Sequence, residues 1–114
     1  MSIQLFLDLS NLTFYGDIPE TPKVQDGQVE EYTLDFDDVM YFMKDIDSLN
    51  SACSSLLDLG DVDFFDAKKC ILLKGWITEK LTRNTAPRYR EILETLFDYC
   101  NRAITLDTGV VIEL

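Results

Sequence analysis

The chain has 114 residues, 46% of them hydrophobic, and a formal net charge of −11 at pH 7. This length predicts a single globular domain over residues 1–114, because a separate core normally needs about 100 residues. The negative charge argues against direct binding to nucleic acid or to an anionic membrane, since both would be repelled. No apolar run is long enough for a membrane span and no basic region precedes the first one, so a cytoplasmic protein is expected.

The charge is distributed unevenly along the chain. Residues 1–66 hold fifteen acidic residues against two lysines and carry a net charge of −13, whereas residues 67–114 carry +2. Such asymmetry indicates a charged partner, although runs of charge also occur on faces that contact only solvent. A basic protein would be attracted to the first half of the chain.

Strands are predicted at the N-terminal end. Residues 3–9 place leucine or isoleucine at every second position, which is the period of a strand with one buried face. A short strand at 12–15 would complete a hairpin with it. Glycine and proline among polar residues predict a surface loop at 16–28, and 29–34 is expected to return as a further strand.

A first helix is predicted over 36–59. Asp35 is placed to cap its start, and Gly60 to end it. One apolar stripe contains Phe36, Val39, Met43, Ile46, Cys53 and Leu57. The opposite face contains Asp37, Tyr41, Lys44, Asp45 and Ser48. Tyr41 is therefore expected to be exposed among carboxylates.

A second helix, over 64–83, is apolar nearly all round, because Leu72 and Trp76 lie outside its main stripe. We therefore expect it to lie centrally, with Gly75 allowing a close backbone approach. A third helix begins at Pro87, and its apolar stripe contains Tyr89, Ile92, Leu93, Leu96, Phe97, Cys100, Ala103 and Ile104.

The last strand is predicted at 110–113, after a turn at 107–109, and it could pair beside the N-terminal strand. The fold class expected from these elements is α+β. A small antiparallel sheet from the N- and C-terminal strands would pack on three α-helices.

No catalytic or cofactor signature occurs in the chain. There is no histidine, no Gly-x-Ser-x-Gly, no phosphate-binding glycine loop and no dinucleotide fingerprint. Cys53, Cys70 and Cys100 are widely spaced and lack the pairing typical of zinc sites, so they are read as three buried thiols. We therefore expect a protein that is not an enzyme and has no metal or other cofactor.

The segment 58–66 contains four aspartates. As a calcium loop counted from Asp61 it fails, because Phe65, Asp66 and Leu72 stand where a ligand, a glycine and a glutamate are needed. As a helix cap it fits better, since Asp63 or Asp66 can accept backbone N–H groups at the start of the second helix. This leaves Asp58 and Asp61 open to a binding role.

The expected function is therefore binding of a basic protein partner. The favoured hypothesis is a bacterial immunity protein that neutralises a toxin nuclease by occluding its basic active site. The alternatives are a phage or plasmid DNA mimic that inhibits a DNA-binding protein, or an acidic subunit of a larger assembly. The predicted partner-binding residues are Asp37, Asp38, Asp45, Asp58 and Asp61 as phosphate-mimicking contacts and Tyr41 as an aromatic anchor, with Phe64 or Phe65 as a second anchor. The competing interpretation buries these three aromatic residues.

Overall fold

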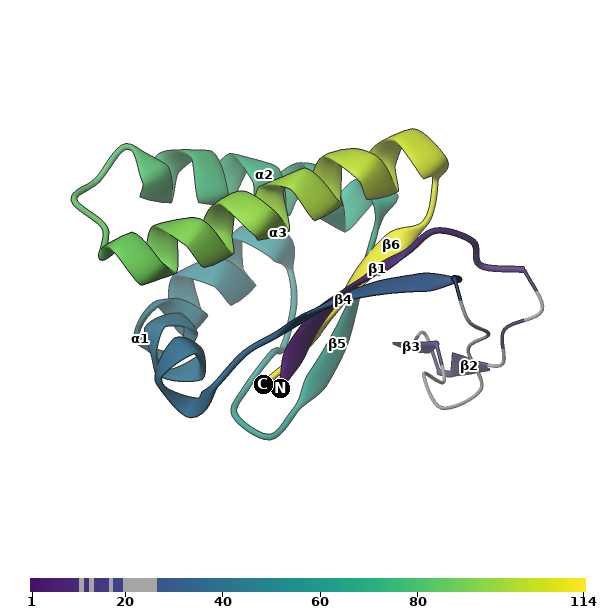
Figure 1. Ribbon diagram of the computed structural model, residues 1–114, viewed down its shortest axis with the longest axis horizontal. Helices are drawn as coiled ribbons and strands as arrows, with labels where there is room; N and C mark the ends of the chain where they lie inside the picture. The colour runs from purple at the N-terminus through teal and green to yellow at the C-terminus, as the bar shows by residue number, and fades with distance from the viewer. Residues whose placement is uncertain (11, 13, 17, 20–26) are drawn as a thin grey trace.

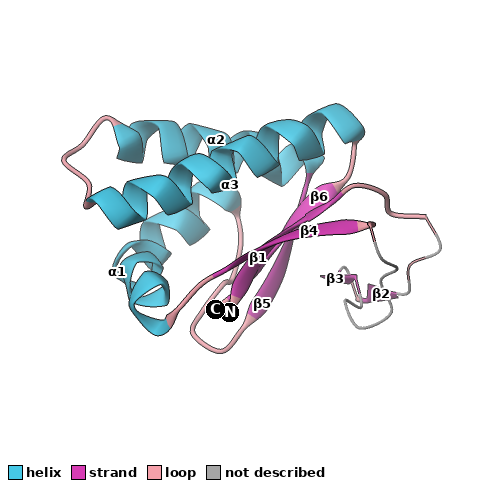
Figure 2. Ribbon diagram, in the orientation of Figure 1, coloured by secondary structure: helices cyan, strands magenta, loops and turns pink. Residues whose placement is uncertain are grey.

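The computed structural model describes the whole chain except residues 11, 13, 17 and 20–26 (Figure 1). Its helices and strands, in chain order, are β1 (Ser2–Phe6), β2 (Phe14–Tyr15), β3 (Ile18–Pro19), β4 (Val29–Thr33), α1 (Phe36–Cys53), β5 (Val62–Asp66), α2 (Ala67–Leu81), α3 (Pro87–Leu106) and β6 (Gly109–Glu113). The predicted α+β class is confirmed: an antiparallel sheet packs against three helices (Figure 2).

The chain ends form the centre of the sheet. Its four strands are ordered β4-β1-β6-β5, and Ile3 of β1 lies opposite both Tyr32 of β4 and Ile112 of β6. The predicted pairing of the last strand with the first is therefore confirmed. The predicted hairpin between the first strand and 12–15 is wrong, because β1 pairs with β4 while β2 pairs with β3.

One face of the sheet supplies the core beneath the helices. Ile3, Leu5, Phe65, Val110 and Ile112 alternate into a single cluster with buried side chains of all three helices. In Figure 1, α2 and α3 lie side by side over this face, and α1 lies nearer the end where both termini are found. The three cysteines are free and buried, as predicted.

The opposite face of the sheet shows why position 109 is a glycine. Phe64 crosses from β5 so that its ring covers Gly109 and makes an edge-on contact with Phe6, with 6.3 Å between ring centroids. A Cβ at position 109 would collide with that ring and would lie 2.7 Å from the carbonyl oxygen of Phe65. Phe65 is fully buried on the helix side, and Phe64 is half-buried against Phe6, so both phenylalanines have packing roles.

Helix α1 begins as predicted and ends earlier than predicted. Asp35 accepts the backbone N–H of Asp38, and the Asp38 side chain accepts that of Asp35, which forms a reciprocal cap. The helix ends at Cys53 because Ser54 adopts the left-handed conformation and the Asn50 side chain bonds to both backbone groups of Leu57. The predicted end near Gly60 is therefore wrong.

Helix α2 begins at Ala67, three residues later than predicted, because Phe64 and Phe65 belong to β5. Of the two predicted caps, Asp66 is the one found: its carboxylate accepts the Lys69 N–H at 2.9 Å, whereas Asp63 lies in β5. The helix contacts α1, α3, β5 and β6, as expected of a central element, but only part of its second apolar side is covered: Trp76 is buried and Leu72 is 47% exposed. No heavy atom outside its own helix turn lies within 4 Å of a Cβ built on Gly75, so the predicted close approach does not occur within the described part of the chain.

Candidate functional site

The structure separates the six predicted partner-binding residues into two groups. Asp37, Asp58 and Asp61 are exposed. Asp38, Tyr41 and Asp45 contact residues of α2 and α3 instead. In the part of the chain that the structure describes, three acidic residues of the first half pair with bases of the second half, in the ion pairs Asp38–Arg88, Asp45–Lys80 and Glu30–Arg102.

Asp38 is a buried structural carboxylate, 2% exposed. The Arg88 guanidinium donates from Nε to Oδ1 at 3.0 Å and from Nη2 to Oδ2 at 2.9 Å, and the Asp35 N–H donates to Oδ2 at 3.0 Å. The hydrogen bond from Arg88 lowers the pKa of Asp38 below its usual range and outweighs the effect of burial. Both oxygens are engaged inside the protein, so Asp38 is not placed to mimic a phosphate on the surface.

The side chains of Asp45 and Tyr41 project from α1 and contact α2 and α3. Asp45 accepts from Lys80 Nζ at 2.7 Å and from the Tyr89 hydroxyl at 2.9 Å. Tyr41 stacks on Tyr89 with 5.1 Å between centroids and 8° between ring planes. Burial, followed by the charge of Asp45, raises the pKa of the Tyr89 phenol. The expectation that Tyr41 is exposed among carboxylates is therefore corrected: it is half-buried beside cationic side chains.

All four aspartates of segment 58–66 accept a backbone N–H from a nearby residue. Asp58 accepts from Leu59, Asp61 from Val62 and Asp63 from Phe64, at 2.7–2.9 Å, in addition to the cap at Asp66. Carboxylates placed along the outermost strand also discourage pairing with a further strand. Each of these bonds uses one oxygen and leaves the negative charge in place.

Exposed carboxylates collect at one end of the sheet. A single row across the four strands contains Thr33, Ser2, Glu113 and Val62, and it spans about 14 Å at normal strand spacing. Carboxylates lie in this row, in the adjoining turn and at the start of α1; we name this set the acidic rim, and it comprises Asp35, Asp37, Asp58, Asp61 and Glu113. Among the described residues, none of the five forms an ion pair.

Large apolar side chains accompany the acidic rim. Phe36 is 60% exposed between Asp35 and Asp37, and Leu59 is 50% exposed between Asp58 and Asp61. The sequence prediction placed Phe36 in the core stripe of the first helix, which is wrong, because Phe36 is the first residue of α1 and its side chain is exposed. The position of Phe36 directly after the helix cap was the feature of the sequence that could have indicated its exposure.

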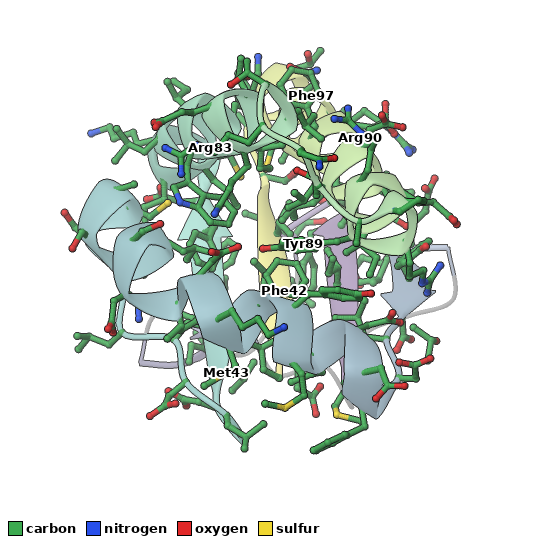
Figure 3. The ribbon with its side chains drawn as sticks, turned by 90° about the vertical axis from the view of Figure 1, so that its left-hand side faces the viewer. Phe42, Met43, Arg83, Tyr89, Arg90 and Phe97 are labelled. Atoms are coloured by element: carbon green, nitrogen blue, oxygen red, sulfur yellow. The ribbon has the colours of Figure 1, made fainter. Side chains whose placement is uncertain are left out.

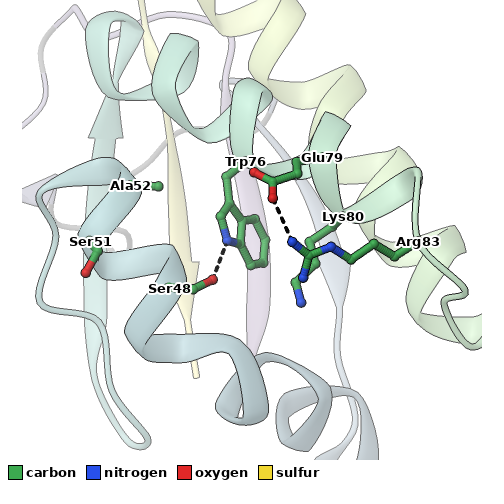
Figure 4. A pocket seen from close by; sticks show the side chains of 7 residues that line it. All are labelled: Ser48, Ser51, Ala52, Trp76, Glu79, Lys80 and Arg83. Atoms are coloured by element: carbon green, nitrogen blue, oxygen red, sulfur yellow. Dashed lines mark hydrogen bonds and ion pairs between the residues drawn. The ribbon is translucent and has the colours of Figure 1, made fainter.

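A groove lined by positively charged side chains lies between α1 and the end of α2. It consists of two adjoining cavities of about 570 and 320 Å³, and Lys80 and Arg83 line both of them. Figure 4 shows the first, where the Trp76 indole N–H donates to Ser48 Oγ at 2.7 Å. Tyr41, Lys44 and Tyr89 line the second. We name the two cavities together the cationic groove.

Figure 3 looks towards this side of the molecule. The Phe42 and Tyr89 rings point into the space behind α1, whereas Arg83 lies above α1, at the end of α2. Phe42 and Tyr89 meet edge-on at 5.5 Å, so the inner wall of the groove is continuous with the core. Sequence patterns did not indicate this groove, because its three cations come from separate places: Lys44 from α1, Lys80 from the last turn of α2 and Arg83 from the turn that follows α2.

Comparisons with known proteins gave no match: no family model, no curated protein and no solved structure matches the chain. Within the described residues, no helix combines the length and apolar character needed to cross a membrane. The described part of the chain also contains no group of three or more histidine, cysteine, aspartate or glutamate side chains arranged to hold a metal ion.

Proposed function

We propose that the protein is a non-enzymatic inhibitor that binds a basic protein partner through the acidic rim. The observation that supports this proposal is the set of five exposed carboxylates, unpaired among the described residues, beside the exposed side chains of Phe36 and Leu59. A negative patch with apolar residues inside it has the two properties that a tight, fast interface needs.

The carboxylates provide the long-range attraction. Steering by complementary charge raises association rates to about 10⁸–10⁹ M⁻¹s⁻¹ at low salt, against about 10⁵–10⁶ M⁻¹s⁻¹ for neutral surfaces. Asp37, Asp58 and Asp61 keep the role expected from the sequence, whereas Asp38 and Asp45 are committed to ion pairs within the protein. Phe36 and Leu59 take the anchoring role first assigned to Tyr41.

The partner we favour is the nuclease domain of a toxin, which makes the protein a bacterial immunity protein. A nuclease active site is basic because its substrate is a polyanion. Carboxylates held across the end of a sheet would occupy the positions of successive phosphates, and the apolar side chains would exclude water around them.

The proposal is tested by capture from the native organism, followed by kinetics with the captured partner. The chain, immobilised away from the acidic rim, should retain a basic protein, and nuclease activity of that protein should fall when the chain is added. Asp58→Asn with Asp61→Asn keeps an oxygen for each backbone N–H and removes two charges. This variant should associate roughly threefold to tenfold more slowly at low salt and show a weaker salt dependence.

The matched control is Glu94→Gln with Asp98→Asn, which removes two charges from the exposed face of α3. It should slow association much less, because those charges lie outside the acidic rim. Equal slowing by the two variants would place the interface elsewhere, and capture of acidic proteins alone would reject the proposal.

A further inference from the structure

The cationic groove is a second surface whose charge opposes that of the whole protein. Its lining contains three cations, Lys44, Lys80 and Arg83, against two carboxylates, Asp45 and Glu79. The chain as a whole carries −11. A local positive surface on such a protein is not explained by binding to a basic partner, so the groove calls for a different ligand.

The floor of the groove is fixed by internal bonds. Asp45 is held by Lys80 on one oxygen and by Tyr89 on the other, and Trp76 is held by Ser48. The Lys80 ammonium also lies 5.8 Å from the centre of the Trp76 ring. The one carboxylate in the floor is therefore neutralised, and the walls need little reorganisation to receive a ligand.

Two cations of the groove remain available. Lys44 is exposed and has no hydrogen bond or ion pair within the described part of the chain. Among the described residues, Arg83 forms an ion pair with Glu79 alone, at 2.7 Å, and the two side chains are 62% and 67% exposed. Such an exposed pair is weak and gives way to a better acceptor. An ammonium and a guanidinium on the two sides of one groove suit an oxyanion, which a guanidinium can hold with two parallel hydrogen bonds.

The backbone does not decide the charge preference. The C-terminal end of α2, which carries the negative end of its dipole, and the N-terminal end of α3, which carries the positive end, meet at this groove. Their effects oppose each other, so the side chains of Lys44 and Arg83 determine the sign of the ligand.

An aromatic surface lies beside the two available cations. Tyr41 is stacked on the buried Tyr89, which fixes the plane of its ring, and it is itself half-buried and lines the smaller cavity. A flat ring held in this way offers a stacking surface at little cost in conformational entropy. The smaller cavity, at about 320 Å³, falls in the size range of small-molecule sites.

We propose that the cationic groove binds a small organic anion, with its phosphate or carboxylate between Lys44 and Arg83 and a planar ring against Tyr41. This role is independent of the acidic rim, because it uses other residues and a ligand of opposite charge. It gives the protein a second ligand alongside its protein partner.

The test is a titration of the full-length chain with inorganic phosphate, phenyl phosphate and benzoate, at low salt, followed by amide chemical shifts in NMR spectra. Saturable shifts should concentrate at Tyr41, Lys44, Arg83 and Thr85. Fluorescence of Trp76, the single tryptophan, gives a second readout because it lines the adjoining cavity. Phenyl phosphate should bind about tenfold more tightly than inorganic phosphate if the ring contact is formed.

Comparison of phenyl phosphate with benzoate distinguishes a phosphate site from a carboxylate site, and tighter binding of either one supports the proposal. Lys44→Ala and Arg83→Ala should each weaken binding about fivefold. The matched control is Lys68→Ala, an exposed lysine at the other end of α2, which should leave binding unchanged. Equal affinity for the two phosphates would overturn the ring contact. Non-saturable shifts with every probe, or equal losses in all three variants, would overturn the site.

Discussion

Two neighbouring aspartates provide the sharpest test of the packing described above. Asp37 is exposed in the first turn of α1, and Asp38, one residue later, is buried against Arg88. Asp38→Ala removes the acceptor of both guanidinium bonds and half of the reciprocal cap. Asp37→Ala makes the same chemical change one residue away without breaking any ion pair between described residues.

The cost of Asp38→Ala follows from its surroundings. Breaking a fully buried ion pair by removing one partner costs about 3–5 kcal/mol, because a charge is left without solvent or partner. The Arg88 side chain is 41% exposed and can be hydrated again, so the bonds and the cap together are worth about 2–4 kcal/mol. In a domain of this size that lowers the melting temperature by about 8–16 °C. Asp37→Ala should change stability by about 0.5 kcal/mol or less.

The assay is thermal and urea unfolding of the three proteins at several pH values. Because Arg88 lowers the pKa of Asp38, the carboxylate stabilises the folded state at pH values above the ordinary pKa of 3.8. That contribution is lost as the pH falls through the lowered pKa. The difference between the wild-type chain and Asp38→Ala should therefore be constant near neutral pH and shrink below pH about 4. Equal stability of the two alanine variants at pH 7 would refute the burial and pairing assigned to Asp38.

Two further predictions concern the core. Gly109→Ala should lower the free energy of unfolding by about 1–3 kcal/mol in urea denaturation, because the added methyl collides with the Phe64 ring and the Phe65 carbonyl. In a Phe64→Ala background, the same substitution should cost less by the part due to the ring, and the complete loss of its cost there would contradict the backbone contact. The three cysteines should react with a thiol reagent at pH 8 only after unfolding, since all are buried and burial raises the pKa of Cys53 to about 11; rapid labelling of the native chain would contradict their burial.

Features set by local chemistry were predicted well. Asp35 and Asp66 lie where a helix cap is expected, and both accept the backbone N–H three residues later. Pro87 begins α3 and Asp107 forms the turn before the last strand, as read from the sequence. These features depend on neighbours within one turn of the chain, so a local pattern is sufficient to identify them.

Most features set by distant contacts were not predicted, although the pairing of the last strand with the first was. The last three residues of β5, Phe64–Asp66, were assigned to the start of a helix, because their strand character depends on pairing with β6 more than forty residues later. The sequence also did not indicate which carboxylates are exposed and which form ion pairs inside the protein. Asp37 and Asp38 are adjacent and chemically identical, yet only Asp38 meets the arginine on α3. Lys44, Lys80 and Arg83 converge on one groove for the same reason.

The sequence by itself determined the α+β class, the capped starts of two helices, the burial of the thiols and the excess of negative charge. These properties depend on composition and on periods of a few residues, which the chain carries wherever it folds. Only the tertiary structure decided which carboxylates remain free at the sheet end, which are neutralised, and where a positive groove remains. Electrostatic pairing acts over a few ångströms in space, and the packing of α1 against α2 and α3 sets those distances.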